Sequence, residues 1–261
     1  MIYKLGKRRA VHDVRTLKLS NYLDITLPSA PVECNWTNKV TTWGMMLNDK
    51  LGICAVAGPG HIEMGWTSQI NKPFIPTDQQ LLTAYSAIAG YDPKATPDPV
   101  TSENPTDTGC VMLDVVKYWR TVGIAGKCIN SFVGVNPADI SQVREAIYIF
   151  GALNIGLALP KFIEKQMCTC VIWDKPADLK GDNEPGSLGG HCVPILKYKP
   201  GIFTCVTWGG LQDMTEAFFQ AYCDEAYACL SINDWTSGRV APNQLRVIEL
   251  QRDLSAFAQV G

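Results

Sequence analysis

One cysteine and one histidine stand out in this chain of 261 residues, because their surroundings suit nucleophilic chemistry. Cys54 lies six positions after the amide side chain of Asn48, where a loop gives way to an apolar segment. His191 follows two glycines and opens another apolar run. A thiol becomes a strong nucleophile only as the thiolate, and a helix N-terminus together with a neighbouring imidazolium lowers the pKa of a cysteine. Cys54 and His191 are therefore a candidate nucleophile and base.

Further residues extend this pattern over roughly residues 27 to 231. Leu27-Pro28 and Trp36 precede the cysteine, Gly190-His191 opens an apolar strand, and Val206-Thr207-Trp208-Gly209 lies on the next strand. In order and rough spacing these residues resemble the papain-like cysteine peptidase family.

The resemblance implies a role for each matching position. Asn48 matches the amide that donates to the oxyanion, Cys54 the nucleophile and His191 the base. Trp208 matches the tryptophan that shields the partner of the histidine. We also expect Gly109, Gly190 and Cys192, with the loop at 91–109, to border the substrate groove.

The chain departs from the family where the histidine is oriented. The usual asparagine two residues before the tryptophan is Val206 here, which cannot accept a hydrogen bond. Thr207 is the nearest hydroxyl, but alternation along a strand predicts that it points away from the face shared by Val206 and Trp208. The pattern therefore implies either a weak enzyme or a substitute acceptor, such as Thr207 or a backbone carbonyl.

The cysteine segment carries a second departure and a competing base. Gly58-Pro59-Gly60 lies inside the expected helix, and an internal proline removes a backbone donor, so we predict a short or kinked helix. His61 lies two turns after Cys54, on the order of 10 Å away, and is expected to be a capped or core histidine.

Composition indicates neither a metal nor a cofactor. Cys168-Thr169-Cys170 is the closest pair among ten cysteines, and one intervening residue is poor spacing for zinc. Most cysteines are expected to be reduced, with Cys205 and Cys229 acting as small buried hydrophobes.

Charge and hydropathy restrict the partners. A net charge of −2 argues against a dedicated nucleic-acid surface. No apolar run is long enough for a membrane span or a secretory signal, so we expect a cytoplasmic protein. The sequence leaves the oligomeric state open.

Three regions are expected along the chain. Residues 1–26 form a basic leader, residues 27–235 the peptidase-like domain, and residues 236–261 an extension with an amphipathic helix at about Gln244 to Val260. The leader is predicted to be a solvated strap or frayed arm, or else an arm for nucleic acid or an acidic partner. It looks too short to fold over a cleft, so autoinhibition is not expected.

Local patterns predict helices in the first half and strands in the second. We expect helices from Thr77 to Ala89, from Cys110 to Thr121, and from the Asn136-Pro137 cap to Phe150. We expect strands at 154–159, 190–198, 202–208 and 227–232, with Lys199-Pro200-Gly201 closing a hairpin. The prediction is an α+β, papain-like two-lobe fold, with a helical lobe and a twisted antiparallel sheet.

The functional expectation is a thiol hydrolase that cleaves peptide or isopeptide bonds through an acyl-enzyme on Cys54, with His191 as base. The alternative is a catalytically weak papain-like module that binds peptides or a partner, or has a structural role. An acyl or amide transferase is a narrower third option. Peptides or proteins are the expected substrates, and the lack of a charged cluster near the two motifs favours an apolar side chain next to the scissile bond.

Overall fold

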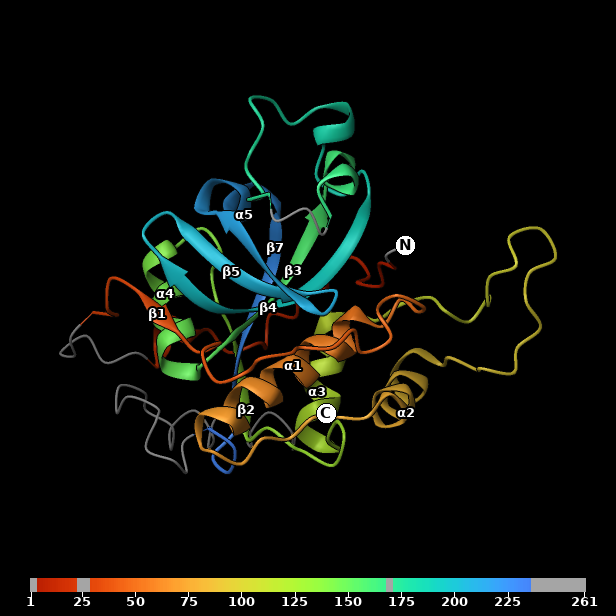
Figure 1. The fold of residues 1–261 in the computed structure, drawn as a ribbon, viewed down its shortest axis with the longest axis horizontal. Coiled ribbons are helices and arrows are strands. Elements are labelled where there is room, and N and C mark those ends of the chain that lie inside the picture. The colour runs from red at the N-terminus through yellow and green to blue at the C-terminus, as the bar shows by residue number, and fades with distance from the viewer. Residues whose placement is uncertain (1–3, 23–28, 168–170, 236–261) are drawn as a thin grey trace.

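The computed structural model of the chain describes residues 4–22, 29–167 and 171–235, and it separates into a group of helices and a twisted sheet (Figure 1). The helices, in chain order, are α1 Cys54–Gln69, α2 Asp78–Ala89, α3 Met112–Thr121, α4 Ile140–Phe150 and α5 Glu216–Tyr222. Helices α1, α2 and α3 contact one another on one side of the sheet, while α4 and α5 pack against strands elsewhere.

The sheet is antiparallel at every strand pair and runs in the order β2-β7-β3-β4-β5-β6, with β1 pairing beside β4. Its strands are β1 Cys34–Asn35, β2 Ser131–Gly134, β3 Leu153–Leu159, β4 Gly189–Lys199, β5 Ile202–Thr207, β6 Gly210–Thr215 and β7 Cys223–Leu230. The α+β prediction, with a helical lobe and an antiparallel sheet, is confirmed.

Helix α1 is the central element, and every residue from its first to its fourteenth is buried. A helix that is apolar on all sides belongs in a core, and α1 packs between α2 and α3 on one side and β3 and β4 on the other. Gly58 and Gly65 permit the close approach to the sheet, because a Cβ at Gly65 would lie 2.6 Å from Leu196 Cδ2. The helix continues through Pro59 for 16 residues, so of the two alternatives expected, a short helix or a kinked one, the short helix is wrong.

Capping explains which helix boundaries could be predicted. The Thr77 hydroxyl and the Gln80 side chain form a capping box, and Gly90 ends α2 in the left-handed region, as expected. Helix α4, in contrast, begins after Asp139, whose carboxylate accepts from the Gln142 N–H, rather than at the expected Asn136 cap.

Four of the expected strands are present as β3, β4, β5 and β7, with boundaries that shift by a few residues. The hairpin at Lys199-Pro200-Gly201 joins β4 to β5. The elements β1, β2, β6 and α5 were not expected. The amphipathic helix predicted at 244–260 and the cysteine pair at 168–170 lie outside the described residues. None of the helices in the described part of the chain has the length and apolar composition that a bilayer crossing requires.

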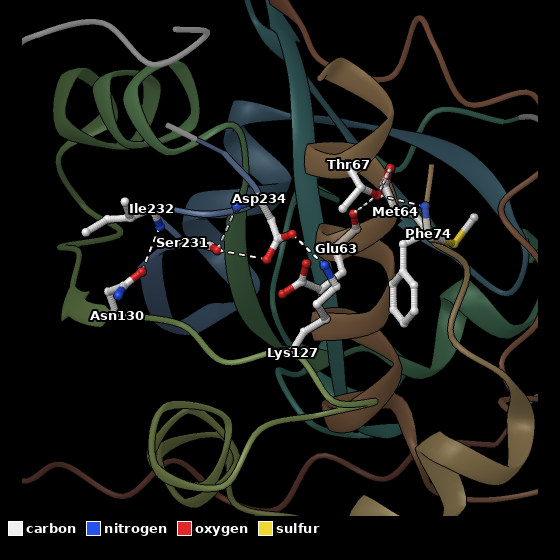
Figure 2. Close-up of polar contacts among 9 residues, drawn as sticks. All are labelled: Glu63, Met64, Thr67, Phe74, Lys127, Asn130, Ser231, Ile232 and Asp234. Carbon is white, nitrogen blue, oxygen red and sulfur yellow. Dashed lines mark hydrogen bonds and ion pairs between the residues drawn. The ribbon is translucent and has the colours of Figure 1, made fainter. Parts of the chain in front are cut away.

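A buried polar cluster lies on the face of α1 turned toward the end of β7 (Figure 2). Glu63 is 2% exposed, and Lys127 and Asp234 form an ion pair of 2.6 Å beside it. Asp234 also accepts from the Ser231 hydroxyl at 3.1 Å. Burial first, and then the negative charge of Asp234, raises the pKa of Glu63 to about 8, against the opposing effects of Lys127 and Trp119.

Glu63 should therefore make stability fall with pH. Between pH 6.5 and 8 the folded chain keeps a proton on Glu63 that the unfolded chain has lost, so the free energy of unfolding decreases as pH rises, by up to about 1.4 kcal/mol per pH unit. Glu63→Gln should remove this slope. Urea denaturation at pH 6.5 and pH 8 measures it, with exposed Glu33→Gln as the control. Parallel pH dependence in the wild-type chain and Glu63→Gln would contradict the assignment.

Candidate active site

The candidate nucleophile is the first residue of α1. The N-cap residue, Ile53, has no side chain able to accept from the first-turn N–H groups. The sulfur of Cys54 lies among backbone donors instead, accepting from the Cys192 N–H at 3.4 Å, and the nearby N–H groups of Gly6 and Ala55 also lower its pKa. The start of α1 thus surrounds a buried sulfur with hydrogen-bond donors, which is an arrangement suited to a thiolate.

The candidate base lies on β4, one residue before the amide that contacts Cys54. His191 is buried, and its Nε2 is 2.8 Å from the Thr207 hydroxyl. Its ring stacks on Trp208 with a centroid separation of 4.4 Å and an interplanar angle of 10°. Among the described residues, Nδ1 has no hydrogen-bond partner. One ring nitrogen is therefore held and the other is left for chemistry.

The end of β5 explains how adjacent residues both reach His191. Strand β5 stops at Thr207, and Trp208 takes a left-handed conformation with φ +42°, followed by Gly209 at φ +77°. Alternation therefore ends at Thr207, and the expectation that Thr207 points away from the face of Trp208 is wrong, because both side chains contact the ring of His191. Val206 is 1% exposed and lies in the core. The sequence suggested either Thr207 or a backbone carbonyl as the substitute acceptor, and the hydroxyl of Thr207 is the group in hydrogen-bond contact with the imidazole.

The amide residue expected before the cysteine is also buried. Asn48 donates from Nδ2 to the Met45 carbonyl at 3.1 Å. Because a carboxamide nitrogen carries two hydrogens, this bond leaves the second N–H for another acceptor.

Two residues that no motif indicated fix the loops beside Cys54. Asp107 accepts from the Gly52 N–H at 3.0 Å and from the Tyr85 hydroxyl at 2.5 Å. The Tyr85 oxygen in turn accepts from the Gly109 N–H at 2.9 Å. This network joins α2, the loop before α1 and the loop before α3. Because its members are remote from one another in sequence, no local pattern indicates the contacts.

The three expected groove residues differ in what they present. A Cβ at Gly109 would lie 2.1 Å from the Gly6 carbonyl oxygen, and one at Gly190 would lie 2.2 Å from that of Lys7. Both glycines therefore contact another segment directly. Cys192 presents its backbone N–H to Cys54, while its thiol turns toward Asn154 Oδ1 at 3.3 Å, between α1 and β3.

The segment that contacts these glycines is residues 4–8 of the leader, called the strap below. Its backbone makes hydrogen bonds both to the loops before α1 and α3 and to strand β4. These bonds are Lys4 N–H to Asn48 O at 3.1 Å, Cys110 N–H to Gly6 O at 2.8 Å, Arg8 N–H to Cys110 O at 2.9 Å and, on β4, Lys7 N–H to Gly190 O at 3.1 Å. Lys7 is buried. The expectation of a solvated strap or frayed arm is wrong for this segment, because its backbone is hydrogen-bonded to Asn48, Cys110 and Gly190. The leader is too short to fold by itself, and this pairing holds it in an extended form.

Burial dominates the electrostatics of Cys54 and His191, and the strap opposes it at Cys54. Burial raises the pKa of the Cys54 thiol, although the N–H groups of Cys192 and Gly6 and the charge of Lys7 oppose this. Burial also lowers the pKa of His191 to about 3. With the strap seated, both groups are therefore neutral at pH 7.

The remaining candidates are structural. Nε2 of His61 lies 3.1 Å from the Gly44 carbonyl, and burial lowers its pKa to about 4, consistent with a core histidine. Cys205 and Cys229 are buried in β5 and β7 as expected. Across the described ranges, no group of three or more His, Cys, Asp or Glu side chains could hold a metal ion.

Comparison with known proteins identifies the architecture. No family model matches the chain, and no curated protein matches it by sequence. Solved structures do match: xylellain, a cysteine protease from Xylella fastidiosa, at TM-score 0.66 and 13% identity, over 88% of this chain and 96% of that one. The fold of this chain is that of the papain-like cysteine proteases. The papain-like fold prediction is thus confirmed.

Two further structures show the same papain-like fold. Procathepsin L 3 of Tenebrio molitor matches at TM-score 0.53 and 11% identity, over 84% of this chain and 77% of that one. Bromelain from Ananas comosus, solved with the E64 inhibitor, matches at TM-score 0.50 and 11% identity, over 77% and 99%. At these identities the match concerns the papain-like architecture, and the site rests on its own geometry.

The contact between Thr207 and His191 predicts a tautomer. If Nδ1 is to accept a proton from Cys54, neutral His191 must carry its hydrogen on Nε2 and donate it to Thr207. Ring ¹⁵N shifts should show this tautomer in the wild-type chain and a mixture in Thr207→Val, with Thr207→Ser restoring the single form. Unchanged shifts in Thr207→Val would show that another group holds the ring.

Steric fit predicts how to open the cleft. A Cβ at Gly6 would lie 1.7 Å from the Gly52 carbonyl oxygen, so Gly6→Ala should displace the strap. Overpacking of this kind costs about 1–3 kcal/mol, so iodoacetamide should modify Cys54 about tenfold or more faster. Mass spectrometry measures the rate, and Arg9→Ala, an exposed leader position, is the control. Equal rates in the two variants would mean that the strap does not limit access.

Proposed function

We propose that the chain is a thiol hydrolase of the cysteine peptidase type, which cleaves peptide or isopeptide bonds through an acyl-enzyme on Cys54. One set of contacts supports the proposal: the N–H of Cys192, the residue after His191 on β4, meets the Cys54 sulfur at 3.4 Å, while Thr207 and Trp208 hold the imidazole and leave Nδ1 unpaired. A nucleophile, a base and a residue that orients the base are the parts that such catalysis needs.

In the proposed reaction, His191 Nδ1 takes the proton of the Cys54 thiol, and the sulfur attacks the carbonyl carbon of the substrate. The tetrahedral intermediate collapses as the imidazolium gives its proton to the departing amine, which leaves a thioester. Water, deprotonated by His191, then attacks the thioester and releases the acid and the free thiol. Nε2 keeps its hydrogen toward Thr207 throughout, so the ring stays in one orientation.

The oxyanion would be stabilised by donors near the start of α1. Asn48 Nδ2 has one N–H committed to Met45, and we assign the other to the oxyanion, together with first-turn N–H groups of α1. Fixed donors of this kind stabilise a developing charge without reorganising. Asn48→Ala should therefore lower turnover without lowering the rate at which Cys54 is alkylated by a small reagent.

A catalytically weak binding module is the alternative, and one observation favours it. Cys54 and His191 are both buried, and burial favours the neutral form of each, whereas nucleophilic attack needs the thiolate. A cleft that holds an extended segment so closely could serve binding alone.

Strap-opened Gly6→Ala separates the two functions. If the chain is a hydrolase, this variant should release fluorophore from a mixed fluorogenic peptide library and form a thioester that hydroxylamine traps, and Cys54→Ala should abolish both. His191→Ala should reduce turnover and also slow the alkylation of Cys54 at pH 7. Amide products formed in the presence of added amines would indicate a transferase.

A Gly6→Ala chain that folds and binds peptides, but shows neither turnover nor enhanced alkylation of Cys54, would contradict the hydrolase and favour the binding module. Circular dichroism and urea denaturation establish folding, with Arg9→Ala as the matched leader variant. The ¹⁵N shifts of the His191 ring, measured on the same variant, then report whether Thr207 still holds the imidazole.

A further inference from the structure

A buried pocket with two carboxylates lies beside the candidate active site and is filled by Lys7. The lysine Nζ is 2.8 Å from Asp224 Oδ2 and 3.1 Å from Glu225 Oε1, and it also donates to the Arg8 carbonyl at 3.3 Å. The side chains of Lys7 and Glu225 are 1% and 3% exposed, and that of Asp224 is 34% exposed. Burial alone would lower the pKa of Lys7, but the two carboxylates outweigh it and raise the pKa.

An irregularity in the sheet builds this pocket. Consecutive residues of a strand point to opposite faces, so Asp224 and Glu225 would ordinarily diverge. Between β3 and β7, however, Gly156 pairs with Glu225 and Leu157 pairs with Cys223, which leaves Asp224 as the extra residue of a bulge. A bulge re-aims side chains, and here both acids meet one ammonium group.

A glycine leaves room for the stem of the lysine. A Cβ at Gly156 would lie 2.0 Å from Lys7 Cε, so any other residue at that position of β3 would obstruct the pocket. Room for an aliphatic stem, with acids beyond it, fits lysine or arginine and no shorter side chain. Burial of a carboxylate without a cation is costly, so the pocket also favours a positive charge chemically.

The pocket lies next to the reacting groups. Lys7 N–H donates to Gly190 O, one residue before His191, and the preceding strap residue, Gly6, lies close enough to Cys54 for its N–H to lower the pKa of the thiol. A peptide seated with a side chain in this pocket would therefore place its adjacent backbone over the thiol.

We propose that Asp224 and Glu225 form a subsite that selects a lysine or arginine side chain of a peptide substrate, and that Lys7 of the strap holds this subsite in the closed chain. The inference rests on the peptide cleft of the proposed function and adds its preference. It replaces the expectation of an apolar side chain next to the scissile bond, because two acids distant from both motifs in sequence reach the cleft through the bulge.

The strap occupies the subsite without being a substrate. It faces the Cys54 sulfur with an N–H group of Gly6, whereas attack requires a carbonyl carbon at that place. Its isolated bridge with Cys110 is parallel, and a chain lying in the opposite direction would present its carbonyls differently. A productive substrate therefore shares the lysine pocket but differs from the strap in direction or register.

Peptide binding to the strap-opened chain tests the subsite. The probe is a fluorescein-labelled peptide with the sequence of residues 4–10, titrated with the Gly6→Ala chain and followed by fluorescence anisotropy. Its partner carries norleucine, which has a similar stem and no charge, in place of Lys7. We expect the lysine peptide to bind about tenfold or more tightly, because charge-assisted bonds in a buried site discriminate strongly against an uncharged analogue.

Variants then locate the preference. Adding Asp224→Asn and Glu225→Gln to the Gly6→Ala chain should bring the two peptides within about twofold of each other, while exposed Glu184→Gln should leave the ratio unchanged. A probe with alanine in place of Gly6 should bind weakly, since it meets Gly52 as the strap variant does. Equal binding of the lysine and norleucine peptides would overturn the proposal, and so would a preference for lysine that survives loss of both acids. The double variant Gly6→Ala/Lys7→Ala also removes the competing lysine of the strap. If the lysine peptide binds neither this chain nor Gly6→Ala, the proposal is likewise overturned.

A positional scanning library of fluorogenic peptides, used on the same chains, separates this result from the proposed function. Cleavage confined to peptides with lysine or arginine at one position supports both, and cleavage that ignores charge overturns the subsite alone. A lysine preference in binding, without cleavage or thioester formation, removes the hydrolase and retains the subsite.

Discussion

The structure depends on the contact between the first turn of α1 and the start of β4, where the Cys192 N–H meets the sulfur of Cys54 across 138 positions of sequence. Small residues make the contact possible, since Gly58 and Gly65 let the helix lie directly on the sheet. Once these backbones are in register, the position of the His191 backbone is fixed as well, because His191 directly precedes Cys192 in β4. The imidazole of His191 is then held by two side chains at the end of β5, the hydroxyl of Thr207 and the indole of Trp208. The geometry of the site thus follows from the close packing of α1 on the sheet. Closely packed cores tolerate added side-chain volume poorly.

Local features of the sequence predicted the parts of the fold that local energetics determine. The capping box at Thr77 and the hairpin at Lys199-Pro200-Gly201 are encoded within a few residues, and both are present. Cys54, His191 and Trp208 could be named as candidates because each lies in a distinctive local setting, and their roles in catalysis stay a prediction. The orientation of Thr207 could not, since it follows from the left-handed conformation of Trp208, a non-glycine residue for which no neighbouring residue gives a signal. The network of Asp107 with Tyr85 and Gly52, and the acids of β7, were missed because their meaning arises only from tertiary contacts.

Charge and burial act against each other throughout the site. A nucleophilic thiolate beside an imidazolium needs polar surroundings, yet burial favours the neutral form of both groups. The same strap brings Lys7, whose positive charge finds its compensation in Asp224 and Glu225 rather than in the thiol. Removing the strap would therefore change two things together: the sulfur would regain solvent, and the two acids would lose their cation. Reactivity at Cys54 and ligand charge at the pocket are coupled through one short segment.

The covalent tether of the strap has a consequence for any ligand of this cleft. A segment joined to the domain that it covers acts as a competitor at an effective concentration in the millimolar range for a short flexible connection, whatever the concentration of the protein. A peptide that binds the open cleft must overcome this fixed competitor, so its apparent affinity for the whole chain is its intrinsic affinity multiplied by the fraction of chains that are open. Dilution cannot relieve such competition. A weak affinity measured with the intact chain would thus reflect how often the strap leaves the cleft as much as how well the peptide fits the cleft.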